Sequence, residues 1–165
     1  MPAPLDPNCI FAELAAHDVD YVLIGGLAAV LHGSTAMTND ADIVPSPESA
    51  NVERVSAALV SLKARLRSES DPDGIAFDPH PELIASMSML NMTTRCGDLD
   101  LTFAPIGLEG FDAIRSRCVN FVVNDLTIQV ASLADIIRSK EAADRPKDHA
   151  TLPILRALKE EIDRK

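Results

Sequence analysis

Apolar and polar positions along the chain follow two periods, which predict amphipathic helices and short strands. In the first half, apolar residues at three- and four-residue steps predict two helices, since this spacing places them on one helical face. Short apolar or alternating runs that end at glycine or proline predict the strands. The expected elements are a helix over 7–17, a strand over 21–24, a short buried helix over 27–31, a strand over 40–44 and a longer helix from about 46 to 66. Asp6 is expected to cap the first helix, because Pro7 suits a first helical turn.

The second half of the chain predicts two hairpins and two C-terminal helices. Each hairpin consists of two β-rich runs around a short turn, and Asn124-Asp125 is a typical turn pair. Ser132 is expected to cap one helix, and Pro146 to separate it from the last one. The expected elements are a loop over 68–81, a short helix over 82–86, strands over 88–94 and 98–103, a helix over 109–117, strands over 119–123 and 126–130, and helices from about 132 to the end.

This order of elements predicts an α/β (α+β) fold, in which a short mixed sheet is flanked by helices. With 165 residues, of which 47% are apolar, the chain has enough material for one compact domain. We therefore expect a single domain over residues 1–165, whose C-terminal helices begin near residue 132. The order of the strands in the sheet does not follow from the pattern.

Composition narrows the class of protein. No apolar run approaches the roughly 20 residues that span a bilayer, and the beginning of the chain lacks the features of a secretory signal. We expect a soluble, cytoplasmic protein that does not interact with membranes. Cys9, Cys96 and Cys118 are odd in number and far apart, so we expect reduced thiols rather than a disulfide or a zinc site.

The charge of the chain bears on nucleic-acid binding. A net charge of -10 argues against a broad basic surface, because affinity for the phosphate backbone comes mainly from Lys and Arg. Basic residues do cluster late in the chain, at Arg138, Lys140, Arg145 and Lys147. A polynucleotide substrate would therefore have to bind at this cluster rather than over a broad surface.

Four aspartates form the most informative chemical pattern. Asp40 and Asp42 are two residues apart on an expected strand and so lie on one face. Asp98 and Asp100 repeat this arrangement on a later strand, and either of them can supply a third carboxylate. Carboxylates from neighbouring strands are the hard oxygen ligands that a two-metal phosphoryl-transfer site requires. Solvated aspartates at strand ends are the alternative interpretation.

Gly25-Gly26 precede a short apolar helix, and their position before Asp40 makes them informative. Such a turn lets backbone amides and a helix N-terminus face a triphosphate without interference from a Cβ atom. Taken alone, the pair is equally well explained as a plain strand-to-helix turn. Ser34, in the loop that follows, is a further candidate for contact with phosphate.

A family resemblance rests on these residues. Ile24-Gly25-Gly26, followed after thirteen residues by Asp40-x-Asp42, resembles the motif of DNA polymerase beta-like nucleotidyltransferases. The stretch from residue 25 to residue 42 is similar to the AbiEii/AbiGii toxin branch of that superfamily. Asp98-Leu-Asp100-Leu resembles the strand that carries its third carboxylate, and residues 139–148 resemble its late motif. The resemblance covers about residues 19–156.

The resemblance implies a Mg2+-dependent nucleotidyltransferase with a polymerase beta-like fold, which moves a nucleoside monophosphate from an NTP to an acceptor hydroxyl. Asp40 and Asp42 would bind two Mg2+ ions, with Mn2+ as a substitute. Asp100 would bind the catalytic ion and help to activate the hydroxyl. Lys140 would neutralise the phosphates of the NTP, and Asp148 would orient Lys140 or a neighbouring base. A solvated surface ion pair is the alternative interpretation of Lys140 and Asp148.

In the family that the chain resembles, acceptors include tRNA ends and other RNA, proteins and small molecules, and several members are toxins with a cognate antitoxin. The sequence does not select the acceptor or the base of the NTP. Many members of the branch carry a basic residue where this chain has residues 35–37. A non-catalytic nucleotide- or partner-binding module with the same fold is therefore the alternative to an enzyme.

Overall fold

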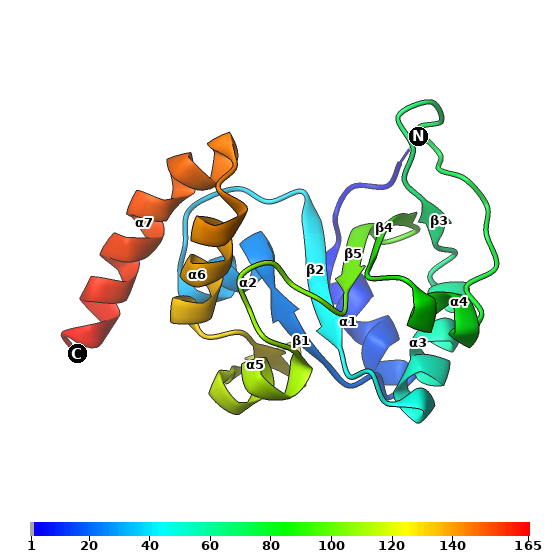
Figure 1. Cartoon of the computed structure of the whole chain (residues 1–165), viewed down its shortest axis with the longest axis horizontal. Coiled ribbons are helices and arrows are strands. Elements are labelled where there is room, and N and C mark those ends of the chain that lie inside the picture. Colours follow the sequence, from blue (N-terminus) through cyan, green and yellow to red (C-terminus); the bar gives the residue numbers. More distant parts are fainter. Residues whose placement is uncertain (1) are drawn as a thin grey trace.

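The computed structural model describes residues 2–165, which form a seven-stranded mixed sheet with helices packed around it (Figure 1). In chain order the elements are α1 (Pro7–Ala16), β1 (Tyr21–Ile24), α2 (Gly25–His32), β2 (Asp40–Pro45), α3 (Ser49–Ser61), β3 (Arg65–Leu66), α4 (Pro81–Ser86), β4 (Met89–Thr94), β5 (Gly97–Thr102), α5 (Phe111–Arg117), β6 (Val119–Val123), β7 (Leu126–Val130), α6 (Leu133–Ala143) and α7 (Pro146–Asp163). The predicted fold class is confirmed. Within residues 2–165, no helix is both long and apolar enough to cross a membrane.

The strands run in the order β3-β4-β5-β2-β1-β7-β6. The two predicted hairpins are confirmed as the antiparallel pairs β4/β5 and β6/β7. Strand β2 is central, antiparallel to β1 and parallel to β5, while β1 pairs in parallel with β7. This order makes neighbours of β2 and β5, which are far apart in the sequence.

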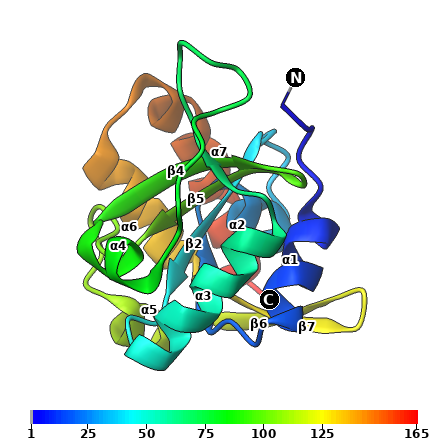
Figure 2. The ribbon, with the colours of Figure 1, turned by 90° about the vertical axis from the view of Figure 1, so that its right-hand side faces the viewer.

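Helices α1 and α3 lie side by side against the sheet, as Figures 1 and 2 show. Buried side chains of these helices, such as Leu14 and Val55, belong to the same core as Ile43 of β2 and Leu99 of β5. Because successive side chains of a strand point to opposite faces, the aspartates next to Ile43 and Leu99 lie on the other face. The carboxylates therefore point away from this core.

The predicted helix caps are confirmed. The Asp6 carboxylate accepts a hydrogen bond from the Cys9 amide at 3.1 Å, and the Ser132 hydroxyl accepts one from the Asp135 amide at 3.1 Å. Helix α7 begins at Pro146, as the fixed φ of proline favours. These boundaries are set by local interactions, which is why the sequence predicts them.

Two predicted boundaries are wrong. Helix α3 ends at Ser61 instead of continuing to Leu66, because Lys63 adopts φ 54° and Leu66 then pairs with Met92 of β4. Strand pairing here outweighs the helical spacing of the apolar residues. The short helix begins at Gly25 rather than at residue 27, so the glycine pair forms its first turn.

The expectation of three reduced thiols is also wrong. Cys9 and Cys96 form a disulfide, with their Cα atoms 5.7 Å apart, whereas Cys118 is free. The fold places helix α1 beside the turn between β4 and β5, which brings together two cysteines separated by 87 positions. Sequence spacing alone contains no trace of this contact.

Candidate active site

Three aspartates meet on the open face of the sheet. Asp40 and Asp42 lie on β2, and Asp100 lies on β5, directly beside Asp42 in the parallel register. One carboxylate oxygen from each residue lies within 4.8 Å of the other two. The alternation along β2 places both of its aspartates on this face, and the pairing of β2 with β5 supplies the third.

The structure distinguishes between the two candidates for the third carboxylate. Asp98 lies beside Asp40 in the register, but it is not part of the cluster that Asp40, Asp42 and Asp100 form. Its Oδ2 lies 3.3 Å from Nε of Arg67. Asp100 is therefore the residue that the fold brings to the pair on β2.

The cluster concentrates negative charge in a partly buried place. Burial, followed by the charges of Asp40 and Asp100, raises the pKa of Asp42 to about 8. Burial also raises the pKa of Asp100, to about 6, although the Arg67 guanidinium at 2.8 Å opposes the rise. Like charges this close hinder each other's ionisation. A bound cation would relieve this repulsion, and carboxylates are the ligands that Mg2+ prefers.

Gly25 and Gly26 allow the chain to pass close to the cluster. Gly25 has φ +75°, and a Cβ atom there would lie 2.4 Å from Oδ2 of Asp42. A Cβ atom at Gly26 would lie 2.9 Å from Oγ1 of Thr38. No side chain caps the N-terminus of α2, so its amides face the same space as the carboxylates. These amides and the helix dipole favour an anion such as a phosphate.

Lys140 and Asp148 lie close to each other, as the late motif suggests. Nζ of Lys140 is 3.5 Å from Oδ1 of Asp148, whose side chain is fully buried. Nε of Arg145 donates to Oδ2 of Asp148 at 2.7 Å. Burial raises the pKa of Asp148, but the hydrogen bonds and charge of Arg145 outweigh it and hold the pKa below its ordinary value. Asp148 thus fixes two cations at the junction of α6 and α7.

One cleft of about 350 Å³ joins these groups. Its lining includes the aspartate cluster, the glycine pair and Lys140, together with Arg145 and Lys147. In the sequence, the signal for Arg145 and Lys147 is their place in the late basic cluster. Asp148 supports the cleft from behind, through Lys140 and Arg145.

Ser34 is not among the residues that line the cleft. It is buried, and its Oγ accepts a hydrogen bond from the amide of Ala36 at 3.2 Å. This contact shapes the loop between α2 and β2. The structure therefore gives Ser34 a role in the turn and does not bring it to the carboxylates.

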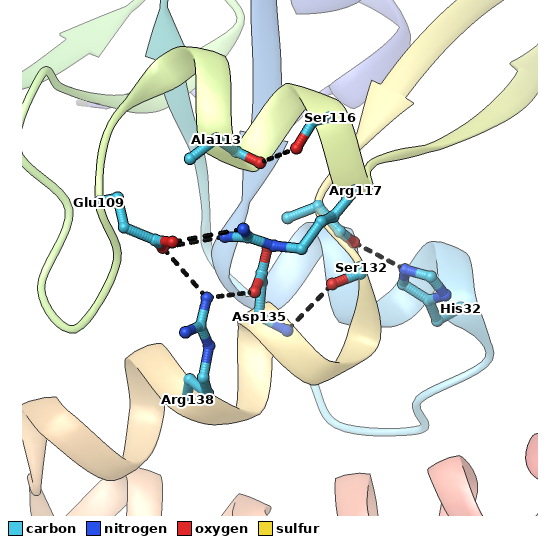
Figure 3. A network of polar contacts seen from close by, with 9 residues as sticks. His32, Glu109, Ala113, Ser116, Arg117, Ser132, Asp135 and Arg138 are labelled. Carbon is cyan, nitrogen blue, oxygen red and sulfur yellow. Dashed lines mark hydrogen bonds and ion pairs between the residues drawn. The ribbon is translucent and has the colours of Figure 1, made fainter.

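The basic cluster expected from the sequence is divided by the fold. Arg138 points to a separate network, in which its Nη2 donates to Asp135 at 2.6 Å and to Glu109 at 3.1 Å (Figure 3). Arg117 of α5 donates to the same two carboxylates. The network connects α5 with α6. Only the other three cations, Lys140, Arg145 and Lys147, line the cleft.

Comparisons with known proteins support the fold. No protein family and no curated protein matches the chain by sequence. The lincosamide antibiotic adenylyltransferase LnuA, solved with lincomycin, matches with a TM-score of 0.60 and 17% identity, over 94% of this chain and 99% of that one. ANT(2'')-Ia in complex with adenylyl-2''-tobramycin matches with a TM-score of 0.54 and 17% identity, over 88% and 83%. An antigenic nucleotidyltransferase-like protein from Paracoccidioides brasiliensis matches with a TM-score of 0.56 and 16% identity, over 94% and 78%.

Identities this low establish a common fold and nothing finer. The match spans nearly the whole of LnuA and of this chain. This protein therefore has the fold of these nucleotidyltransferases.

Proposed function

We propose that this protein is a nucleotidyltransferase, which transfers a nucleoside monophosphate from an NTP to a hydroxyl group and releases pyrophosphate. The observation that carries the proposal is the single cleft in which three clustered carboxylates face three cations and an uncapped helix N-terminus. Phosphoryl transfer depends mainly on positioning and on charge stabilisation, and this arrangement offers both.

The carboxylate cluster fits a divalent cation. Asp40, Asp42 and Asp100 would hold Mg2+, two ions as the resemblance implies, and Mn2+ would substitute. Bound Mg2+ supplies positive charge to the attacking and leaving oxygens of the transfer. The raised pKa of Asp42 supports this assignment, because burial and repulsion among the three carboxylates disfavour the ionised cluster without a cation.

The cations of the cleft would hold the triphosphate. Lys140, fixed by Asp148, would contact the phosphates, and Arg145 and Lys147 would add charge from the same side. The amides of Gly25 and Gly26 would approach the phosphates closely, since neither residue carries a Cβ atom. In the reaction, the acceptor oxygen bonds to the α-phosphorus as the bond to the bridging oxygen of pyrophosphate breaks. The hydroxyl proton passes to the carboxylate of Asp100.

A small molecule is the acceptor that the cleft favours. Met89, Ile106 and Leu108 line the same cleft as the carboxylates and the cations, and a cleft that combines apolar side chains with placed polar groups is typical of small-ligand sites. No aromatic side chain or histidine among the described residues lines the cleft to stack on a nucleic-acid base. The structural neighbours were solved with lincomycin and with adenylylated tobramycin. RNA, protein and antitoxin partners, as in the toxin branch, are outcomes that the experiment must distinguish.

The proposal is tested by incubating the protein with each α-32P-labelled NTP, Mg2+ and one of three acceptor pools: small metabolites and antibiotics, total RNA, or cell-lysate proteins. The matched variants are Asp42→Asn, which removes a cluster carboxylate, and Glu161→Gln, which removes an exposed carboxylate of α7. We expect label on a small acceptor with the wild type and Glu161→Gln, but not with Asp42→Asn. Tight Mg2+-dependent NTP binding without any labelled product would establish the non-catalytic binding module instead.

A further inference from the structure

Arg67 reaches the carboxylate cluster from the edge of the sheet. It follows β3 directly, and its amide donates to the carbonyl of Asn91 on β4 at 2.9 Å. Its side chain crosses β4, where Nη2 donates to the carbonyl of Met92 at 3.0 Å, and reaches β5, where Nη2 donates to Oδ1 of Asp100 at 2.8 Å. Nε lies 3.3 Å from Oδ2 of Asp98. One guanidinium thus spans both aspartates of β5.

These contacts are built into the strand register. Arg65 pairs with Thr93 and Leu66 with Met92, so the ladder continues to Arg67 opposite Asn91. Asn91 in turn lies beside Asp100. Arg67 is therefore in the same cross-strand row as the third carboxylate, two strands further out. About a third of its side chain is exposed, which leaves the guanidinium ordered by its partners rather than by burial.

Arg67 differs from the other cations of the site in that it forms direct ion pairs with the carboxylates of β5. Within residues 2–165, no other Lys, Arg or His forms an ion pair with the cluster or with Asp98. Lys147 and Arg145 act on Asp42 only through longer-range charge. Arg67 bonds Oδ1 of Asp100 and leaves Oδ2 without a bond to it.

We propose that Arg67 is a positioning residue that serves as the built-in counter-cation of the carboxylate cluster. Its guanidinium holds Asp98 away from the cluster and fixes Asp100 by one oxygen, so that the other oxygen is presented to the acceptor hydroxyl. This inference rests on the proposed function for the identity of the reaction.

The role has a signature that a purely structural role lacks. The guanidinium repels an incoming divalent cation, so its removal should tighten cation binding. Its removal also frees the Asp100 carboxylate to rotate, which should slow transfer, because small misplacements of a reacting group are costly. Cation affinity and turnover should therefore change in opposite directions. A variant that is merely damaged loses both.

The experiment compares Arg67→Gln, Arg67→Lys and Arg164→Gln with the wild type. Arg164 follows α7, and its replacement changes the net charge as Arg67→Gln does without touching the cluster. Mn2+ binding to the metal-free proteins is measured by electron paramagnetic resonance of the free ion, and kcat is measured separately with labelled NTP. Circular dichroism melting establishes that each variant is folded.

We expect Arg67→Gln to bind Mn2+ about threefold to tenfold more tightly, while its kcat falls by about tenfold or more. Arg67→Lys should bind Mn2+ like the wild type, because it keeps the positive charge. It should transfer nucleotide more slowly, because it lacks the planar guanidinium that contacts both aspartates. Arg164→Gln should change neither quantity. Weaker or unchanged Mn2+ binding by Arg67→Gln would overturn the inference, as would a normal kcat in Arg67→Lys.

The outcomes separate this inference from the proposed function. If the wild type binds Mn2+ but transfers no nucleotide, the transferase proposal fails, and the Mn2+ affinities alone decide the role of Arg67 as counter-cation. If the wild type binds no Mn2+, both proposals fail.

Discussion

Replacing Asp42 by Asn should stabilise the metal-free protein at pH 8 while it abolishes nucleotide transfer. Burial and the charges of Asp40 and Asp100 raise the pKa of Asp42 from 3.8 to about 8. At about 1.4 kcal/mol per pK unit, this rise sets an upper bound of about 5 to 6 kcal/mol on the destabilisation by the ionised carboxylate. Asn keeps the cost of burying a polar group but loses the charge. We therefore expect the free energy of unfolding to increase by about 1–3 kcal/mol.

The pH dependence gives the sign of the effect. The folded protein retains the Asp42 proton up to about pH 8, whereas the unfolded chain releases it near its ordinary pKa of 3.8. Between these values the folded state binds more protons, so the stability of the wild type falls as the pH rises. The advantage of the Asn variant should therefore be largest at pH 8 and shrink towards pH 4.

The assay is urea denaturation in EDTA at several pH values, followed by far-ultraviolet circular dichroism because the chain has no tryptophan and one tyrosine. Glu161→Gln is the control for the change in net charge and should leave the midpoint unchanged at every pH. Saturating Mg2+ should stabilise the wild type more than Asp42→Asn, since the variant lacks a ligand. An Asp42→Asn variant that is no more stable than the wild type at pH 8 in EDTA would refute the reasoning.

Three further variants test other parts of the site. Gly25→Ala should lose about 1–2 kcal/mol of stability, because its backbone is left-handed. It should also lose most of its Mn2+ affinity, because the new Cβ atom would lie 2.4 Å from Oδ2 of Asp42. A normal Mn2+ titration would contradict this expectation. Asp148→Asn should lose about 1–3 kcal/mol, since the fully buried side chain gives up its charge-assisted contacts with Lys140 and Arg145. It should also weaken NTP binding by freeing Lys140, and an unchanged NTP affinity in calorimetry would contradict this role. Asp135→Ala should lose about 2–4 kcal/mol by removing the buried carboxylate at the centre of the network of Figure 3. Its Mn2+ affinity should stay normal, and a large change would show that the network reaches the site.

Local physics explains what the sequence predicted well. Helix starts at Asp6 and Ser132 follow from hydrogen bonds within one turn, so a short window of sequence contains the whole cause. The pairing of Asp40 and Asp42 on one face follows from the two-residue period of a strand. The same period left Asp98 and Asp100 equivalent, because both lie on the same face of their strand.

The predictions from the sequence were wrong where contacts between distant segments decide the structure. Helical spacing continued to Leu66, but pairing with β4 made a strand of that residue. The long separation of Cys9 and Cys96 in the sequence led to the prediction of reduced thiols, but α1 lies beside the hairpin turn and the two form a disulfide. The basic cluster looked continuous, but buried Asp135 draws Arg138 into a different network.

The sequence by itself determined the type of fold, the pair of aspartates on one strand and the glycines before them, because each depends on neighbours within a few residues. Only the tertiary structure decided that Asp100 joins the pair, since this follows from the parallel register of β2 and β5. It also brought Lys140 across the cleft and Arg67 across β4 to the carboxylates. Such contacts join residues that are far apart in the sequence, so no local sequence pattern predicts them.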